Sequence, residues 1–184
     1  MTYAIKLGAD NVDLKCKTTY WGRGLDLTDC EMSNSSNGFA IGSYFEISYL
    51  GLIMLRSQTV FYSDEIANDI VELKEIIKFP WELINTEAAG EYAFQGSFGL
   101  EQHPAVLKKV RHTIRAKQVV PAMQVFSTLS GDAIEIDTEE INTNNILAQK
   151  DVRYYLVDYG VSLRVSVQTA TSNDIYTVKN IEID

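Results

Sequence analysis

The feature that most constrains the fold is a strict alternation of apolar and polar residues near the C-terminus. Between Val161 and Gln168 the apolar residues are Val161, Leu163, Val165 and Val167, and each is followed by a polar one. A period of two is typical of a β-strand with one buried side. The preceding run Arg153–Asp158 is rich in β-branched and aromatic residues, and Gly160 can supply a positive φ for a tight turn between the runs. The stretch Asp151–Thr169 therefore predicts a long antiparallel hairpin with Leu163 and Val165 in the core.

Several other stretches carry the same kind of pattern and predict further strands. These are Tyr3–Leu7, Val12–Tyr20, Phe39–Ser48, Leu52–Val60, Val119–Leu129, Ala133–Asp137 and Ile175–Ile183. Within Phe39–Ser48, the residues Phe39, Ile41, Ser43, Phe45 and Ile47 are expected on one side. Two glycines around an arginine at Trp21–Gly24 predict a sharp turn, because no strand–GxGxxG–helix pattern that would bind a nucleotide is present.

Three segments predict helices. Ser63 is a candidate N-cap, and Ile66, Ile70, Leu73 and Ile77 are spaced to form one buried stripe before Pro80 ends the helix. A second helix is expected from Pro104 to about Lys117, with Val106, Leu107, Val110 and Ile114 as its buried stripe. The spacing Asp137-x-x-Glu140 can cap a short third helix.

The segment Phe79–Gln102 is the least regular part of the sequence. It interleaves five aromatic residues with three glycines, which is compatible with a lid or a partner-binding loop. The interpretation that we favour is a long loop whose aromatic side chains plug the edge of the core. Together these patterns predict an α+β fold: mainly antiparallel β-sheet with two or three helices packed on it, in a single domain covering residues 1–184.

Length and composition are those of one globular domain in a cytoplasmic protein. The chain has 184 residues, no apolar run long enough for a membrane span and no secretory signal at its N-terminus. We therefore expect the cytoplasm as its compartment, and two reduced thiols at Cys16 and Cys30. A bridge between these two cysteines is the alternative.

The charge distribution is the strongest functional signal. The formal net charge is −9, yet residues 102–131 hold five basic side chains and no acidic one. An acidic protein repels nucleic acid and anionic membranes and attracts basic partners, so we expect neither nucleic acid nor a membrane as a partner. Pairing between the basic segment and neighbouring acids, or simple solubility, would account for the same distribution.

No motif predicts catalysis or a cofactor. The two histidines, His103 and His112, are nine residues apart, and no clustered set of metal-ligand residues is present. Cys16 or Cys30 could pair with a histidine only by chance of folding. We therefore expect no metal, no cofactor and no catalytic residue, and a binding protein rather than an enzyme.

The first functional hypothesis is a protein-binding protein, for example an immunity or antitoxin-type inhibitor of a basic, nuclease-like toxin. The candidate partner-binding residues are Glu135, Asp137, Glu139 and Glu140, and the second candidate surface is Lys108, Arg111, His112 and Arg115. One alternative is a small-molecule enzyme or ligand binder, with a pocket near residues 79–115 and with His112 and Arg111 or Arg115 on an anionic substrate. Another is a structural assembly protein, for example of a phage.

Overall fold

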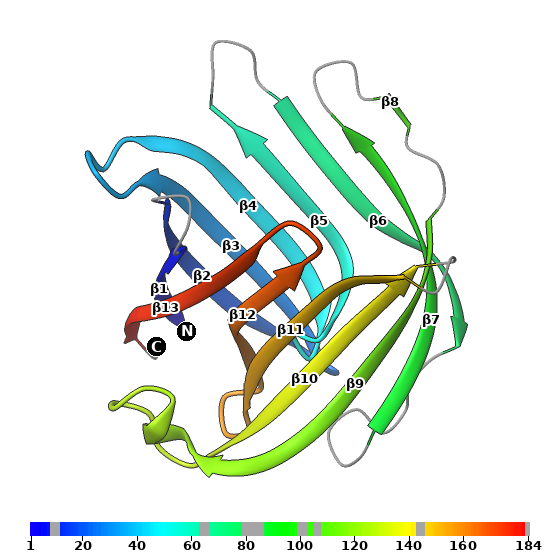
Figure 1. The fold of residues 1–184 in the computed structure, drawn as a ribbon. Helices are drawn as coiled ribbons and strands as arrows, with labels where there is room; N and C mark the ends of the chain where they lie inside the picture. The colour runs from blue at the N-terminus through cyan, green and yellow to red at the C-terminus, as the bar shows by residue number, and fades with distance from the viewer. Residues whose placement is uncertain are drawn as a thin grey trace. The chain divides into compact units, whose positions relative to one another are not determined.

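The computed structural model describes residues 1–7, 12–62, 67–78, 87–98, 103–104, 108–142 and 146–182 (Figure 1). The described chain divides into two compact units. The first is built from Met1–Glu72, Gln95–Val106 and Tyr176–Asp184, and the second from Leu73–Phe94 and Leu107–Ile175. The prediction of one domain over residues 1–184 stays a prediction.

The first unit is an antiparallel sheet in which consecutive strands mostly lie side by side. Its pairings run in the order β6-β5-β4-β3-β2-β1-β13. The strands that belong to it wholly or in part are β1 (Thr2–Leu7), β2 (Val12–Gly22), β3 (Leu25–Asn34), β4 (Ala40–Tyr49), β5 (Ile53–Phe61), β6 (Ala67–Lys78), β7 (Glu87–Phe98), β8 (His103–Pro104) and β13 (Asn173–Glu182). The predicted turn at Trp21–Gly24 is confirmed, since Gly22, Arg23 and Gly24 all have positive φ and join β2 to β3.

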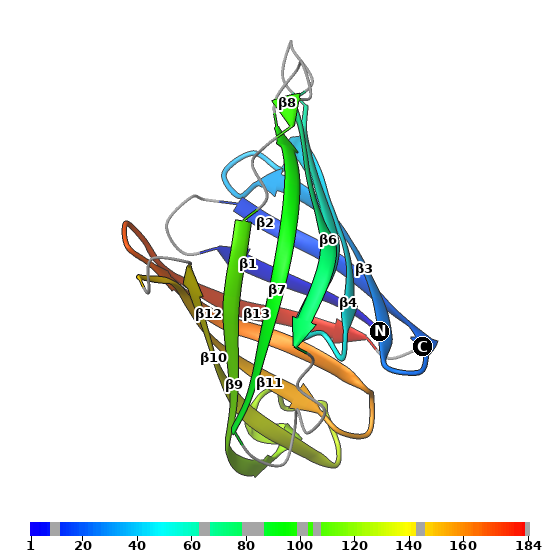
Figure 2. The ribbon, with the colours of Figure 1, turned by 90° about the vertical axis from the view of Figure 1, so that its right-hand side faces the viewer.

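The second unit is also antiparallel, with the pairing order β7-β9-β10-β11-β12-β13 (Figure 2). Its own elements are β9 (Lys108–Pro121), the short 3-10 helix η1 (Ala122–Gln124), β10 (Asp132–Asn142), β11 (Leu147–Leu156) and β12 (Val161–Thr169). Ala133, Leu156 and Val161 are neighbours across β10, β11 and β12, and each is at most 4% exposed. They belong to the apolar core of this unit.

The hairpin predicted from the alternation is confirmed as β11 and β12. Gly160 has a φ of 66° in the connecting turn, and Leu163 is 1% exposed. The alternation does not, however, persist along the whole of β12. Arg153 pairs with Arg164 whereas Val152 pairs with Ser166, so Val165 is an extra residue that makes a bulge. Arg164 therefore lies on the same side as Val167, and Leu163 lies on the other.

The predicted α+β fold is wrong, because the described residues form strands where helices were expected. Residues 67–78 of the first expected helix form β6, and residues 108–117 of the second belong to β9. One side of β9 carries Val110, His112, Ile114 and Ala116, three of which are apolar. Basic residues dominate the other side. The backbone groups of β9 pair with β7 and β10, and this long-range pairing outweighs the helical spacing of Val110 and Ile114.

The remaining helix and loop predictions fail in the same way. Ile77, expected in the buried stripe of the first helix, is 44% exposed. Asp137 and Glu140 lie within the continuous strand β10 and begin no helix. Of the predicted loop Phe79–Gln102, residues 87–98 form β7, whereas residues 79–86 and 99–102 lie outside the described residues. The strand expected over Val119–Leu129 ends at Pro121, which lacks the N–H that a further ladder bond would need.

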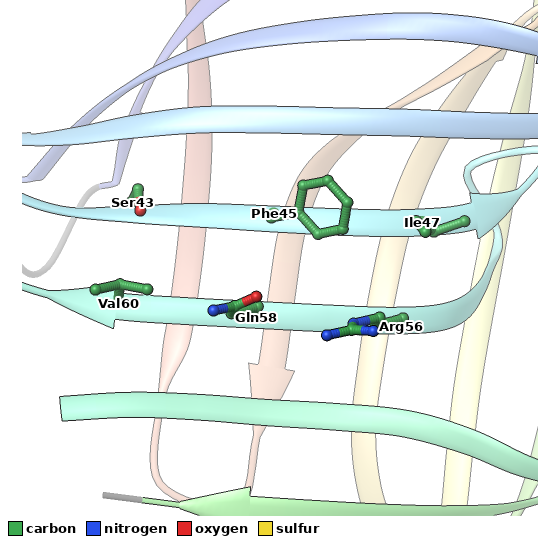
Figure 3. Close-up of a pocket in the computed structure, with 6 residues that line it drawn as sticks. All are labelled: Ser43, Phe45, Ile47, Arg56, Gln58 and Val60. Carbon is green, nitrogen blue, oxygen red and sulfur yellow. The ribbon is translucent and has the colours of Figure 1, made fainter. Parts of the chain in front are cut away.

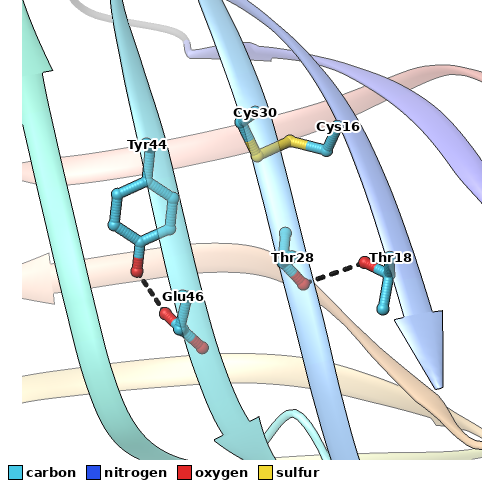
Figure 4. The surroundings of a disulfide bond; sticks show 6 residues. All are labelled: Cys16, Thr18, Thr28, Cys30, Tyr44 and Glu46. Atoms are coloured by element: carbon cyan, nitrogen blue, oxygen red, sulfur yellow. Dashed lines mark hydrogen bonds between the residues drawn. A yellow bond between two sulfur atoms is a disulfide. The ribbon is translucent and has the colours of Figure 1, made fainter. Parts of the chain in front are cut away.

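The prediction of two reduced thiols is also wrong. Cys16 and Cys30 are directly opposite each other in β2 and β3, with a Cα–Cα distance of 4.0 Å, and they form a disulfide (Figure 4). On the same side of the sheet, Thr18 and Thr28 share a hydrogen bond of 2.9 Å between their hydroxyl groups. Sequence reasoning kept the bridge only as the alternative because it placed no strand over residues 25–34, so it had no register in which the two cysteines meet.

Candidate functional site

A pocket of about 380 Å³ lies on one side of β4 and β5 in the first unit (Figure 3). Three cross-strand pairs line it: Ser43 with Val60, Phe45 with Gln58, and Ile47 with Arg56. Its size is within the range of small-molecule sites, and its mixture of apolar and a few polar groups is typical of them. The alternation of Ser43, Phe45 and Ile47 was visible in the sequence and is confirmed.

Arg56, at one end of this pocket, takes part in an ion pair with a residue outside the lining. Nη1 of Arg56 lies 3.2 Å from Oε1 of Glu72, which faces it from β6. The side chains of the two residues are 43% and 32% exposed, so solvent reaches the pair. Within the described chain this single contact is the only polar interaction of the Arg56 guanidinium group. The remaining N–H groups of Arg56 can therefore donate to a bound molecule.

The opposite side of β3 and β4 is polar and more deeply buried. Asp26 is 1% exposed, and no hydrogen bond of good geometry reaches either of its carboxylate oxygens in the described chain. The pKa of Asp26 is raised from 3.8 to about 7: burial is the largest cause, the nearby charge of Glu46 acts in the same direction, and the backbone N–H of Gly51 acts against both. Glu46 accepts a hydrogen bond from the hydroxyl of Tyr44 (Figure 4). Asp26 therefore titrates near neutral pH.

The four predicted partner-binding acids all lie in β10, but they do not form one acidic surface. Glu135, Asp137 and Glu139 alternate onto one side of the strand, and Glu140 lies on the other. Asp137 is 3.3 Å from Nζ of Lys117 and Glu139 is 3.7 Å from Nζ of Lys150. Glu135 accepts a hydrogen bond of 2.7 Å from the side-chain amide of Gln118. Local partners already offset much of the charge that a basic protein would recognise, and binding of such a protein stays a prediction.

The second candidate surface is divided between the two sides of β9. Arg111 and Arg115 lie on one side, where Arg111 is 3.4 Å from Glu91. His112 is on the other side, where the charges of Arg153, Asp151 and Arg164 act on it. Lys108 begins the strand, and nothing is described of its side chain. The structure thus separates His112 from the two arginines expected to act with it and brings it to two arginines that the sequence did not single out.

The described residues contain no group of three or more histidine, cysteine or acidic side chains placed to hold a metal ion. No helix among them has the length and apolarity needed to cross a membrane. Comparisons with models of protein families, with curated proteins and with solved structures find no match.

Proposed function

We propose that the protein is a non-enzymatic binding protein for a small amphipathic anion, held in the pocket on β4 and β5. The observation that carries the proposal is the lining of this pocket: Phe45, Ile47 and Val60 offer an apolar surface, and Arg56 supplies a cation at one end. An aromatic or aliphatic body would lie against the apolar side chains, and an anionic head group would accept hydrogen bonds from Arg56.

Two features of the surroundings support an anion over a cation. The planar guanidinium group of Arg56 presents several N–H donors in a fork that matches a carboxylate, and Glu72 occupies only part of it. The acids that neighbour the pocket in β3, Asp29 and Glu31, are themselves directly opposite Lys17 and Lys15 of β2. These opposite charges offset each other, and Arg56, whose own charge Glu72 partly offsets, supplies the N–H donors that favour an anion.

The lining also supports binding rather than catalysis. Among the described residues that line the pocket there is no histidine, cysteine or carboxylate that could act as a general acid or base. Ser43 is the one hydroxyl group among the lining residues, and a serine needs an adjacent base to become a nucleophile.

The proposal is tested with two naphthalene probes of similar shape, one anionic and one uncharged. We expect 2-naphthoate to bind the protein in isothermal titration calorimetry, and the uncharged 2-naphthalenemethanol to bind more weakly. Arg56→Gln should weaken 2-naphthoate binding by roughly tenfold or more, because hydrogen bonds to a charged group are lost. Phe45→Ser should weaken the binding of both probes.

Arg23→Gln is the matched control, because it removes the same charge from an exposed turn of the same unit, outside the pocket. It should leave the affinity for both probes unchanged. Equal binding of 2-naphthoate to the Arg56→Gln variant and to the unmodified protein would refute the proposal, as would the absence of any binding.

A further inference from the structure

The pocket on β4 and β5 has a long and narrow lining. Its residues form three consecutive cross-strand pairs, and every pair joins an apolar residue of one strand to a polar residue of the other. The pairs are Ser43 with Val60, Phe45 with Gln58, and Ile47 with Arg56. The register is regular from one end pair to the other, because the shift between β4 and β5 lies beyond Ile47. The lining is therefore a strip that is one pair wide and three pairs long.

The length of this strip follows from strand geometry. Ser43 and Ile47 are four residues apart in β4, and a rise of about 3.4 Å per residue places them roughly 14 Å apart along the strand. Neighbouring strands are only about 4.8 Å apart, so the strip is about three times as long as it is wide. A molecule that fills the strip is linear rather than compact.

Two polar side chains that can make further hydrogen bonds lie at opposite ends of the strip (Figure 3). The hydroxyl of Ser43 has no polar partner in the part of the chain that the structure describes, and it can both donate and accept. At the other end, Arg56 pairs among the described residues only with Glu72, which also has a second interaction of its own. Gln58 lies between the two ends and already has a polar interaction. The polar groups available to a ligand are therefore those at the ends.

Apolar side chains line the strip along its whole length. Phe45 lies in the middle, with Ile47 at the arginine end and Val60 at the serine end (Figure 3). All three are half-buried, so part of their apolar surface is accessible and a hydrocarbon chain can cover it. The strip thus matches a ligand with an anionic group, an apolar chain and a second polar group, in that order.

We infer that the pocket binds a linear carboxylate with a hydroxyl group at its far end, the carboxylate on Arg56 and the hydroxyl on Ser43. This inference rests on the proposed function and names the class of anion. An extended chain advances about 1.2 Å per bond, and the two terminal hydrogen bonds take up part of the span of roughly 14 Å. The ligand that spans the strip therefore has roughly eight to ten carbon atoms.

The terminal hydroxyl distinguishes this ligand from an ordinary fatty acid. A hydroxyl group that enters an apolar pocket without a partner weakens binding, because it loses its hydrogen bonds to water. A hydroxyl group in contact with Ser43 replaces those bonds and adds affinity. The presence and the absence of the contact therefore predict opposite effects of the same atom.

Isothermal titration calorimetry on the unmodified protein compares three acids of equal chain length and charge. We expect 8-hydroxyoctanoate to bind roughly three- to tenfold more tightly than octanoate, since its hydroxyl reaches Ser43. We expect 5-hydroxyoctanoate to bind more weakly than octanoate, because its hydroxyl lies beside Phe45 in the middle of the strip.

Three variants assign the contacts. Ser43→Ala removes one hydroxyl and should reduce the affinity for 8-hydroxyoctanoate to that for octanoate or below, with the affinity for octanoate unchanged. Ser57→Ala is the matched control and should change neither affinity, because Ser57 is in β5 but its side chain lies on the other side of the sheet. Arg56→Gln should weaken the binding of all three acids alike, since each carries the carboxylate.

The comparison of 8-hydroxyoctanoate with octanoate on the unmodified protein decides the inference even without a folded Ser43→Ala variant. The inference is overturned if 8-hydroxyoctanoate binds no more tightly than octanoate, or if Ser43→Ala leaves its advantage intact. The proposed function would still stand in that case, provided that Arg56→Gln weakens the binding of 2-naphthoate and octanoate. Affinities that do not depend on Arg56 would overturn the proposed function and this inference together.

Discussion

Replacing Asp26 by asparagine should make the protein more stable at neutral and alkaline pH. Asp26 is buried, it lies near Glu46, and its pKa is raised from 3.8 to about 7. At 1.36 kcal/mol for each pKa unit, ionising Asp26 in the folded state costs about 4 kcal/mol relative to ionising it in the unfolded chain. Asparagine has nearly the same shape and no charge to bury, so Asp26→Asn removes this cost.

The sign of the effect depends on pH in a defined way. A carboxyl group with a raised folded-state pKa binds its proton more tightly in the folded protein than in the unfolded chain. Its contribution to stability is greatest below pH 3.8, falls as the pH rises towards about 7, and is then constant. The advantage of Asp26→Asn should therefore be small near pH 4, grow steadily between these values and approach about 4 kcal/mol above pH 7.

Urea denaturation followed by circular dichroism over a pH series measures this difference. Asp29→Asn is the control, since Asp29 is an exposed acid in the same strand, and its substitution should change stability by only a few tenths of a kcal/mol at any pH. A stability difference between Asp26→Asn and the unmodified protein that did not vary with pH would refute the reasoning. So would a variant that is less stable than the unmodified protein at pH 8.

Two further predictions concern the disulfide and the hairpin. Cys16→Ser with Cys30→Ser should lower the free energy of unfolding by about 3 kcal/mol, because the bridge closes a loop with a sequence separation of 14; an unchanged urea midpoint in the presence of a reductant would contradict this. Leu163→Asp buries an unpaired charge at a position that is 1% exposed and should abolish cooperative unfolding. Gln168→Asp, at an exposed position of the same strand, is the control and should fold normally.

The strands predicted from alternation were recovered because a half-buried strand needs only local information to be recognised. β9 shows where this fails. Val110 and Ile114 fit a helix stripe as well as one side of a strand, and His112 between them interrupts the apolar alternation that would have indicated the strand. Backbone pairing with β7 and β10 makes this segment a strand rather than a helix. The paired residues lie outside residues 108–121, so the local pattern contains no signal of the pairing.

The candidate sites depend on register, which the sequence does not reveal. The side of β4 that carries Phe45 could be read from the alternation, but Arg56 and Gln58 face it only because of the pairing between β4 and β5. Arg164 is a clearer example of a residue whose side of the sheet depends on register. Its position in the alternating run predicts the side opposite to Val167, and the single extra residue Val165 moves it to the side of Asp151.

Gly90 offers a test of what holds the ring of Tyr92 in place beside His112. A Cβ atom at Gly90 would lie 2.7 Å from Cε2 of Tyr92 and closer still to its hydroxyl, so the ring lies over the bare glycine. Because Tyr92 is 1% exposed, it cannot move aside without disturbing its contact with His112. Gly90→Ala should therefore destabilise the protein by about 1–3 kcal/mol. In a Tyr92→Ala background the clash is absent, and Gly90→Ala should be neutral or slightly stabilising, since alanine restricts the unfolded chain. A double-mutant cycle measured by urea denaturation gives the coupling directly. If Gly90→Ala has the same effect in both backgrounds, the aromatic ring is not the reason that this position carries glycine.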